Sequence, residues 1–205
     1  MSAVADSGRI ASYYDELVDR YGHDPRACDA SGVESLERRY RVLGDVMDLS
    51  GKRVLEVGCG FGDLGAHLHR RYDGVVYRGV DLSPRMVEAG RATHGLDLRV
   101  SNVLDLDPAV ERYDVVLAQG IFYLLEGDAE AKMQELVRAM TALADEAVAF
   151  TAVSSWTPSP EPGEYYVDPV SLLDLCRTLT PFVAIRHDYH PGDVAAYLYL
   201  KGAHR

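Results

Sequence analysis

The residues best suited to chemistry follow a short apolar segment, Arg53–Val57. Gly58, Gly60 and Gly62 come directly after it, and glycines in that place let the backbone turn sharply and approach a ligand closely. The run from Gly60 to Gly65 also matches the pattern that binds dinucleotides. The loop therefore predicts a nucleotide-like ligand and leaves its kind open.

An acidic residue inside the apolar segment narrows the choice of ligand. Glu56 lies two residues before Gly58, where burial of a carboxylate is unfavourable without a cationic partner. It would repel a pyrophosphate and attract an ammonium group. Asp81 ends the next apolar segment and can accept hydrogen bonds from both ribose hydroxyls, as acids do in both ligand classes. Ser101–Val103, after a third segment, offer an amide and backbone groups that can read adenine.

In four motifs the chain resembles the class I S-adenosylmethionine-dependent methyltransferases. These motifs are Glu56–Gly62, Gly79–Met86, Ser101–Val103 and Tyr113–Leu124, and they stand in the family's order. The resemblance extends over nearly the whole chain. It implies a Rossmann-like α/β fold, S-adenosylmethionine as the cofactor, and methyl transfer as the activity.

The resemblance also implies roles for single residues. The expected cofactor-binding residues are Glu56, Gly58, Gly60, Gly62, Asp81, Leu82, Met86, Asn102, Val103 and Gln119. Asp81 would bind the ribose, Asn102 would face the adenine amine, and Gln119 would bring a backbone carbonyl toward the methionine amine. Leu82 would lie beside the adenine, and Met86 would lie there or in the core.

Tyrosines are concentrated where they can surround a sulfonium, a cation without hydrogen-bonding protons. The chain has 13 tyrosines against one tryptophan and four phenylalanines. In this family a stretch such as Tyr13–Tyr21 often folds over the cofactor. We therefore expect Tyr14 and Tyr21 to be lid residues, with simple amphipathic packing as the open alternative. Together with Tyr123 they are the candidate catalytic residues.

A smaller set of bacterial methyltransferase-like proteins without an assigned substrate resembles the chain further. The shared segments are Asp24–Arg26, Gly120–Phe122, Ser154-Ser155 and Arg186–Tyr189. In that set asparagine commonly follows Gly120–Phe122, at a position expected to face the transferred carbon, and here the residue is Tyr123. No substrate can therefore be carried over. His23, His187 and His190 are the histidines considered as a base.

The elements that must position these residues alternate between strand and helix. Apolar segments predict strands at Arg53–Val57, Val75–Val80, Leu96–Val100, Tyr113–Ala118, Ala147–Val153, Phe182–His187 and Ala195–Leu200. Helical spacing predicts helices at Arg9–Gly22, Val33–Met47, Leu64–Tyr72, Pro84–Gly90 and Asp128–Leu143, with another starting at Asp168-Pro169. Ser31–Glu34 resembles a capping box, and the last two strands read as a hairpin.

This order predicts one S-adenosylmethionine-binding domain over residues 1–205, with an N-terminal helical cap at 1–48 and a Rossmann-like core at 51–205. The expected fold is a mostly parallel seven-stranded sheet with a C-terminal antiparallel hairpin and helices on both faces. Ligands of such sheets bind beyond the carboxyl ends of the strands.

Composition limits the partners. The 205 residues carry a net charge of −11, which argues against nucleic acids and anionic membranes, whose recognition needs an excess of basic residues. Cys28, Cys59 and Cys176 are widely spaced, so we expect neither disulfides nor a metal site, and a reducing, cytoplasmic location. The start of the chain lacks a signal-peptide pattern. Monomer and homodimer stay open.

Methyl transfer to a small molecule, such as a bacterial secondary metabolite or its precursor, is the leading interpretation. The proline-rich segment 154–166 fits a loop that bounds a pocket. One alternative is an enzyme that cyclises S-adenosylmethionine itself to azetidine-2-carboxylate and methylthioadenosine. A non-catalytic S-adenosylmethionine-binding protein is another, and an NAD-dependent oxidoreductase is disfavoured by Glu56.

Overall fold

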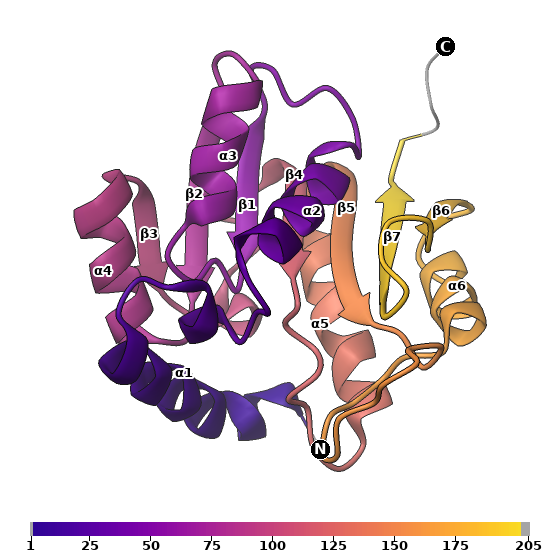
Figure 1. The fold of residues 1–205 in the computed structure, drawn as a ribbon. Helices are drawn as coiled ribbons and strands as arrows, with labels where there is room; N and C mark the ends of the chain where they lie inside the picture. The colour runs from indigo at the N-terminus through magenta and orange to yellow at the C-terminus, as the bar shows by residue number, and fades with distance from the viewer. Residues whose placement is uncertain (1, 202–205) are drawn as a thin grey trace.

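Seven strands form one sheet in the order β3-β2-β1-β4-β5-β7-β6 (Figure 1). The computed structural model describes residues 2–201. The strands are β1 (Arg53–Val57), β2 (Val76–Asp81), β3 (Asp97–Val100), β4 (Tyr113–Gln119), β5 (Ala144–Val153), β6 (Phe182–Arg186) and β7 (Asp193–Tyr199). Strands β1 to β5 pair in parallel, and β7 lies antiparallel between β5 and β6. The predicted fold class, including the C-terminal hairpin, is confirmed.

Helices cover both faces of this sheet. They are α1 (Ser7–Tyr21), α2 (Val33–Gly44), α3 (Asp63–Arg71), α4 (Pro84–His94), α5 (Ala129–Leu143) and α6 (Pro169–Arg177), with short 3-10 helices η1 (Ala3–Asp6), η2 (Pro25–Cys28) and η3 (Val103–Asp105). None of the helices within residues 2–201 is long and apolar enough to cross a membrane.

Alternating strand residues divide the core between the two faces. On one face, Val116 and Phe150 pack with Met133 and Met140 of α5. On the other, residues such as Leu117 pack with apolar side chains of α2 and α3. Because a buried aliphatic or aromatic side chain stabilises the fold by about 1.5–3 kcal/mol, these two layers hold the strand ends in place.

Three details of the helices differ from the sequence-based expectation. Helix α2 ends at Gly44 and does not reach the predicted Met47. The prediction of a capping box at Ser31–Glu34 is wrong, because Gly32 is the N-cap of α2 and no side chain caps its first turn. Helix α4 passes Gly90 and ends at His94, with Gly95 as its C-cap at a φ of 65°. A Cβ at Gly90 would lie 2.3 Å from the carbonyl oxygen of Phe61, so this glycine allows close packing and does not end the helix.

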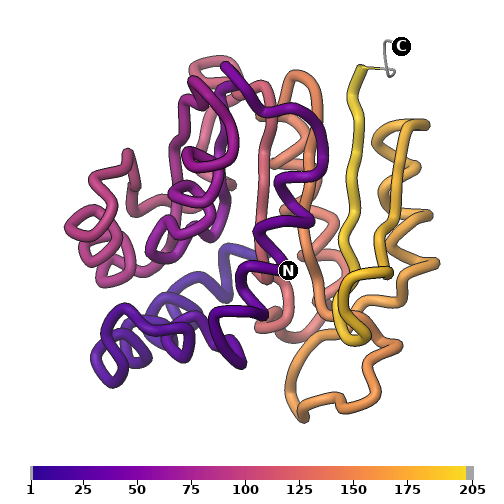
Figure 2. Tube along the Cα trace, turned by 45° about the horizontal axis from the view of Figure 1, so that its top comes forward, coloured from indigo at the N-terminus to yellow at the C-terminus, as the bar shows by residue number. Residues whose placement is uncertain are grey.

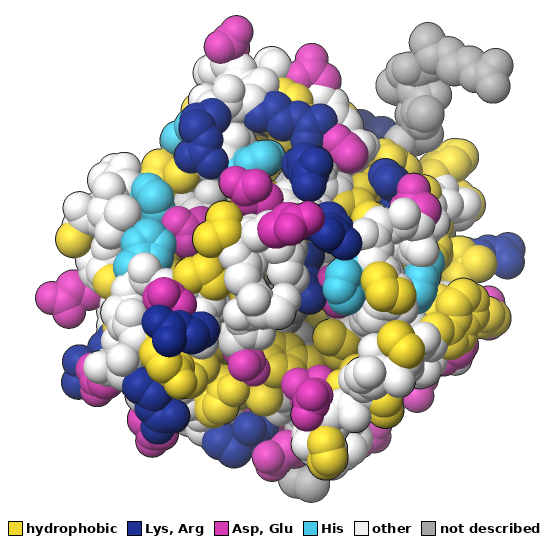
Figure 3. Space-filling view, viewed as in Figure 1, with side chains coloured by type: hydrophobic (Ala, Val, Ile, Leu, Met, Phe, Trp, Pro, Cys, Tyr) yellow, Lys and Arg dark blue, Asp and Glu magenta, His cyan; other side chains and the backbone are white. Residues whose placement is uncertain are grey.

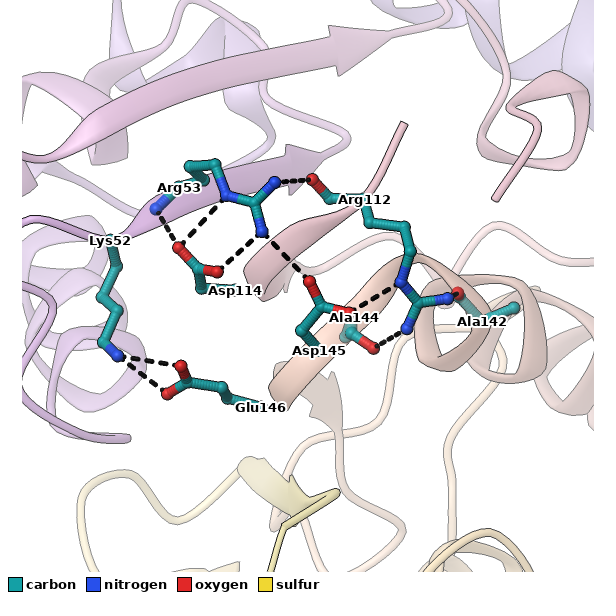
Figure 4. A network of polar contacts seen from close by, with 8 residues as sticks. All are labelled: Lys52, Arg53, Arg112, Asp114, Ala142, Ala144, Asp145 and Glu146. Carbon is teal, nitrogen blue, oxygen red and sulfur yellow. Dashed lines mark hydrogen bonds and ion pairs between the residues drawn. The ribbon is translucent and has the colours of Figure 1, made fainter. Parts of the chain in front are cut away.

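Polar groups fix the amino ends of the central strands, at the edge of the sheet opposite the glycine loop (Figure 4). Arg53 bonds two carboxylates, that of Asp114 near the start of β4 and that of Asp145 near the start of β5. Lys52 is paired with Glu146, with Nζ 2.9 Å from the carboxylate. These contacts hold β1, β4 and β5 in register at the edge where no ligand is expected.

The N-terminal segment lies across the opposite edge, under the carboxyl ends of the parallel strands (Figures 1 and 2). A buried ion pair and two hydrogen bonds are among the contacts that anchor it to the core. Lys132 Nζ lies 2.7 Å from Asp6 Oδ2 in a buried ion pair, Ser83 Oγ donates to Asp15, and Asn102 Nδ2 donates to Ser7. Helix α2 instead packs on the sheet. The segment that covers the strand ends therefore consists of η1, α1 and η2, and we call it the lid.

Candidate active site

The glycine loop after β1 turns back toward β2 in a left-handed conformation. The φ angles of Gly58, Gly60 and Gly62 are 69°, 52° and 79°, a region that favours glycine. Asp81 at the end of β2 holds this loop, since one of its carboxylate oxygens accepts from the Gly60 N–H at 2.7 Å. Its other oxygen accepts from the Ser83 N–H at 2.8 Å. Each oxygen keeps a further lone pair for a ligand hydroxyl.

A cavity of about 680 Å³ lies between the strand ends and the lid. Its walls are the glycine loop, the ends of β2, β4 and β5, residues of α1, and the segment 161–164. Figure 3, viewed from the same side as Figure 1, shows the hollow in the lower middle of the molecule, with acidic side chains at its rim. A volume of this size is typical of pockets for small molecules and cofactors.

Glu56 lies buried in the floor of the cavity, with 3% of its surface exposed. The hydroxyl of Tyr77 donates a hydrogen bond to its carboxylate. Gly65 of α3 permits this contact, because a Cβ there would lie 2.5 Å from the Tyr77 ring. Burial raises the pKa of Glu56 well above its usual range, and the acidic neighbours Asp63 and Asp81 add to the shift. A cationic ligand group would stabilise the ionised form.

Two further polar groups on the cavity wall suit a ligand that carries an amine and a carboxylate. The side-chain oxygen Oε1 of Gln119 is buried and has no hydrogen-bond partner within residues 2–201, so it is an acceptor that lacks a donor. Arg39 is the only lysine or arginine among the described residues that line the cavity. Its guanidinium is fixed by Asp193, with Nε 2.6 Å from Oδ2.

Tyrosine hydroxyls converge on Asp29, which also lines the cavity. The hydroxyl oxygens of Tyr14 and Tyr123 lie 2.7 Å apart. Tyr123 donates to Asp29 Oδ2 at 3.0 Å, and Tyr13 donates to the same oxygen at 2.9 Å. Asp29 is the one non-glycine residue of the described chain with a left-handed backbone, at φ 50°. Such residues are enriched at functional sites.

These tyrosines stay protonated at neutral pH. Burial, with the nearby carboxylate of Asp29, raises the pKa of Tyr13 to about 12. Burial also raises the pKa of Tyr14 and that of Tyr123, each beyond the range of ordinary buffers. The hydroxyls can therefore donate hydrogen bonds but cannot serve as phenolate bases, and the Asp29 carboxylate is the hydrogen-bond acceptor of the group.

Other predicted cofactor residues also line the cavity: Leu82, Met86, Asn102 and Val103. Asn102 is already engaged, because its oxygen caps η3 at the Leu104 N–H and its nitrogen donates to Ser7. One lone pair and one hydrogen of its amide are left for a base. Val103 begins η3, where a backbone N–H has no acceptor within the helix.

Tyr21 and the three candidate histidines are not among the residues that line the cavity. The Tyr21 ring packs beside Phe61 and Met86, with the Arg26 guanidinium 4.7 Å from its centroid. His187 bonds the buried Ser154 at 2.8 Å, and His190 accepts from the Gly192 N–H. Tyr14 and Tyr123 thus meet in the cavity, whereas Tyr21 packs the end of α1 against the core and does not line the cavity.

Sequence reasoning missed Asp29, Arg39 and Asp193. Asp29 follows a short 3-10 helix that no hydrophobic pattern marks, and Arg39 stands on the polar side of an amphipathic helix among other charged residues. Arg39 and Asp193 are 154 residues apart in the chain. Only the packing of α2 against the sheet brings the two together.

Comparison with known proteins decides the family. Residues 54–142 match the model of a methyltransferase domain. Rv1506c of Mycobacterium tuberculosis, which is named as a methyltransferase, is 30% identical over 149 residues, which are 66% of this chain and 86% of that protein. The chain belongs to the class I S-adenosylmethionine-dependent methyltransferases. The cofactor is accordingly S-adenosylmethionine.

Other methyltransferases match a part of the chain. A fatty-acid O-methyltransferase of Mycolicibacterium smegmatis is 37% identical over 113 residues, which are 50% of this chain and 41% of that enzyme. The magnesium protoporphyrin IX methyltransferase of Synechocystis PCC 6803, solved with S-adenosylhomocysteine, has the same fold, with a TM-score of 0.71 at 14% identity over 95% of this chain and 99% of that one. A shared fold does not show that this chain acts on the substrates of these methyltransferases.

Proposed function

We propose that this methyltransferase transfers a methyl group from S-adenosylmethionine to a small neutral or cationic acceptor held between the cofactor and Asp29. The observation that carries the proposal is that one cavity is lined by two sets of polar groups. The first set, Glu56, Gln119 and Arg39, would form a cofactor end, and the second, the tyrosines around Asp29, would form an acceptor end.

The first end fits the cofactor. The unpartnered Gln119 oxygen and the buried Glu56 carboxylate suit the methionine ammonium, and Arg39 suits its carboxylate. Asp81 would bind the ribose hydroxyls while it holds the glycine loop. Asn102, Val103, Leu82 and Met86 would surround the adenine. When bound, S-adenosylmethionine supplies a methyl group that is activated by its sulfonium.

The second end fits the acceptor. Tyr14 and Tyr123 would orient the acceptor and exclude water, since positioning in line with the methyl group supplies much of the rate. Asp29 would accept the proton that the acceptor loses, directly or through the Tyr123 hydroxyl, which already donates to it. A carboxylate base of this kind serves an acceptor nitrogen or hydroxyl.

The charges around this end favour amines and phenols over carboxylates. Asp29, Glu161 and Glu164 line the cavity, and the one basic lining residue, Arg39, would be occupied by Asp193 and the cofactor carboxylate. An anionic acceptor would meet these carboxylates without a compensating cation. This argues against the fatty acids that the Mycolicibacterium relative is named for.

The test is product analysis with isotope-labelled S-adenosylmethionine and three acceptor panels of amines, phenols and carboxylic acids. We expect S-adenosylhomocysteine and a labelled amine or phenol, identified by mass spectrometry. Methylation confined to carboxylic acids would overturn the acceptor class. Methylthioadenosine formed from the cofactor alone would overturn methyl transfer itself.

A further inference from the structure

Three metal-binding side chains meet at the outer end of the glycine loop. They are His23, Asp63 and His94, whose ligand atoms all lie within 4.8 Å of one another. Asp63 Oδ1 is shared, with His23 Nε2 at 3.0 Å and His94 Nε2 at 2.7 Å. In Figure 3, histidine side chains gather over α4 on the left of that face.

Each of the three side chains comes from a different segment and is held there. His23 follows the end of α1, and its ring packs on Phe61 with the centroids 4.3 Å apart. Asp63 is the first residue of α3, and His94 is the last of α4. The two imidazole rings stand nearly perpendicular, at 85°. Both Nε2 atoms therefore point at one carboxylate from different directions.

We propose that His23, Asp63 and His94 bind one divalent transition-metal ion of the Zn²⁺ class. Two neutral imidazoles and one carboxylate are a common ligand set for Zn²⁺, whereas Mg²⁺ and Ca²⁺ prefer oxygen ligands alone. Ligand atoms around a tetrahedral zinc lie about 3.3 Å apart, so the nitrogen–oxygen distances of 3.0 and 2.7 Å need to open by about 0.3 and about 0.6 Å.

Solvent access leaves room for the ion and for water as a fourth ligand. The side chains of His23, Asp63 and His94 are 30%, 27% and 21% exposed. The expectation of no metal site rested on cysteine spacing, which does not bear on these ligands. Their separations along the chain, 40 and 31 residues from Asp63, follow no sequence motif.

A bound ion would join the lid to the core. His23 lies between α1 and η2, and Asp63 follows the glycine loop directly. The ion would thus stabilise the closed position of the lid over the cavity without being part of the transfer chemistry. The competing explanation is a simple hydrogen-bonded cluster in which both imidazoles donate to Asp63.

Titration of chelator-treated full-length protein with ZnCl₂ and with CoCl₂ distinguishes the two explanations. We expect one Zn²⁺ per chain with micromolar or tighter affinity, a higher melting temperature with Zn²⁺, and the visible absorption of four-coordinate Co²⁺. In hydrogen exchange, Zn²⁺ should protect residues 22–28. The absence of stoichiometric binding in the wild type would overturn the proposal.

Variants assign the site. His23→Ala and His94→Ala should each weaken Zn²⁺ binding by more than about tenfold, and the double variant should abolish it. His69→Ala, which removes another exposed histidine from α3, is the matched control and should bind as the wild type does. Circular dichroism checks that each variant is folded. Stoichiometric binding that survives the double variant would place the ion elsewhere and contradict the assignment.

Discussion

The hydroxyl oxygens of Tyr14 and Tyr123 lie 2.7 Å apart although 109 residues separate them in the chain. One belongs to the lid and the other to the segment after β4, so their contact closes the cavity from both sides. Because the proton of Tyr123 is donated to Asp29, Tyr14 is the donor in the contact between the two tyrosines. The lid and the proposed acceptor site therefore share one hydrogen-bond chain.

Tyr123→Phe should lower kcat by about 10- to 100-fold, since the acceptor loses its fixed orientation and its link to Asp29. The Kd for S-adenosylhomocysteine should change little. Tyr14→Phe removes only the outer bond of the chain and should be milder. Steady-state rates and calorimetry separate the two effects.

The control for both variants is Tyr199→Phe, which removes a hydroxyl that bonds the Val46 carbonyl at 3.0 Å, outside the cavity lining. It should keep the wild-type rate. A Tyr123→Phe variant that is folded and fully active would show that the hydroxyl chain is a packing feature.

Glu56→Gln should stabilise the ligand-free protein at neutral pH. Because burial raises the pKa of Glu56, the folded chain holds a proton that the unfolded chain releases above about pH 4.5. The stabilising contribution is fully present below that pH and is lost as the pH rises through the raised pKa. The difference in unfolding free energy between the variant and the wild type should therefore grow as the pH rises above about 4.5 in urea titrations.

The same variant should bind S-adenosylmethionine about tenfold more weakly, because a neutral amide replaces the carboxylate opposite the ammonium. A higher unfolding free energy together with weaker S-adenosylmethionine binding would show that the Glu56 carboxylate serves the ligand at the expense of stability. If Glu56→Gln lost stability and kept its affinity, Glu56 would be a structural residue.

Asp81→Ala should weaken cofactor binding by about 1.5–3 kcal/mol, because the hydrogen bonds to the ribose and to the glycine loop are lost together. Asp81→Asn keeps an acceptor oxygen and should lose less. Asp174→Asn on α6, an exposed acid, is the matched control. An unchanged Kd in a folded Asp81→Ala variant would remove Asp81 from the site.

Asp6→Asn should lower the free energy of unfolding by about 3–5 kcal/mol, since it leaves Lys132 buried without its charge partner. Asp19→Asn breaks an exposed pair with Arg85 and should lower it by less than about 1 kcal/mol. Equal effects in chemical denaturation would contradict the anchoring role of the buried pair. Deleting residues 1–22 would also unpair Lys132, so point variants test the lid better than truncation does.

The strand ends could be predicted from the sequence because local patterns mark them. Val54, Leu55 and Val57 are apolar and come directly before glycines, and Asp81 ends another apolar segment. The pairing of Asp29 with Tyr123, or of Arg39 with Asp193, could not be predicted. These contacts depend on how α1 and α2 pack against the rest of the chain. Tertiary packing determines that arrangement, and local hydrophobic periodicity does not indicate it.

The most direct test of the central claim, that the cavity beside Glu56 and Asp81 is the S-adenosylmethionine site, is calorimetric titration of the wild-type protein. S-adenosylmethionine, S-adenosylhomocysteine and NAD would be titrated under one set of conditions. We predict micromolar binding of the first two at one molecule per chain and no saturable binding of NAD. Tighter binding of NAD than of either sulfur nucleotide would contradict the account.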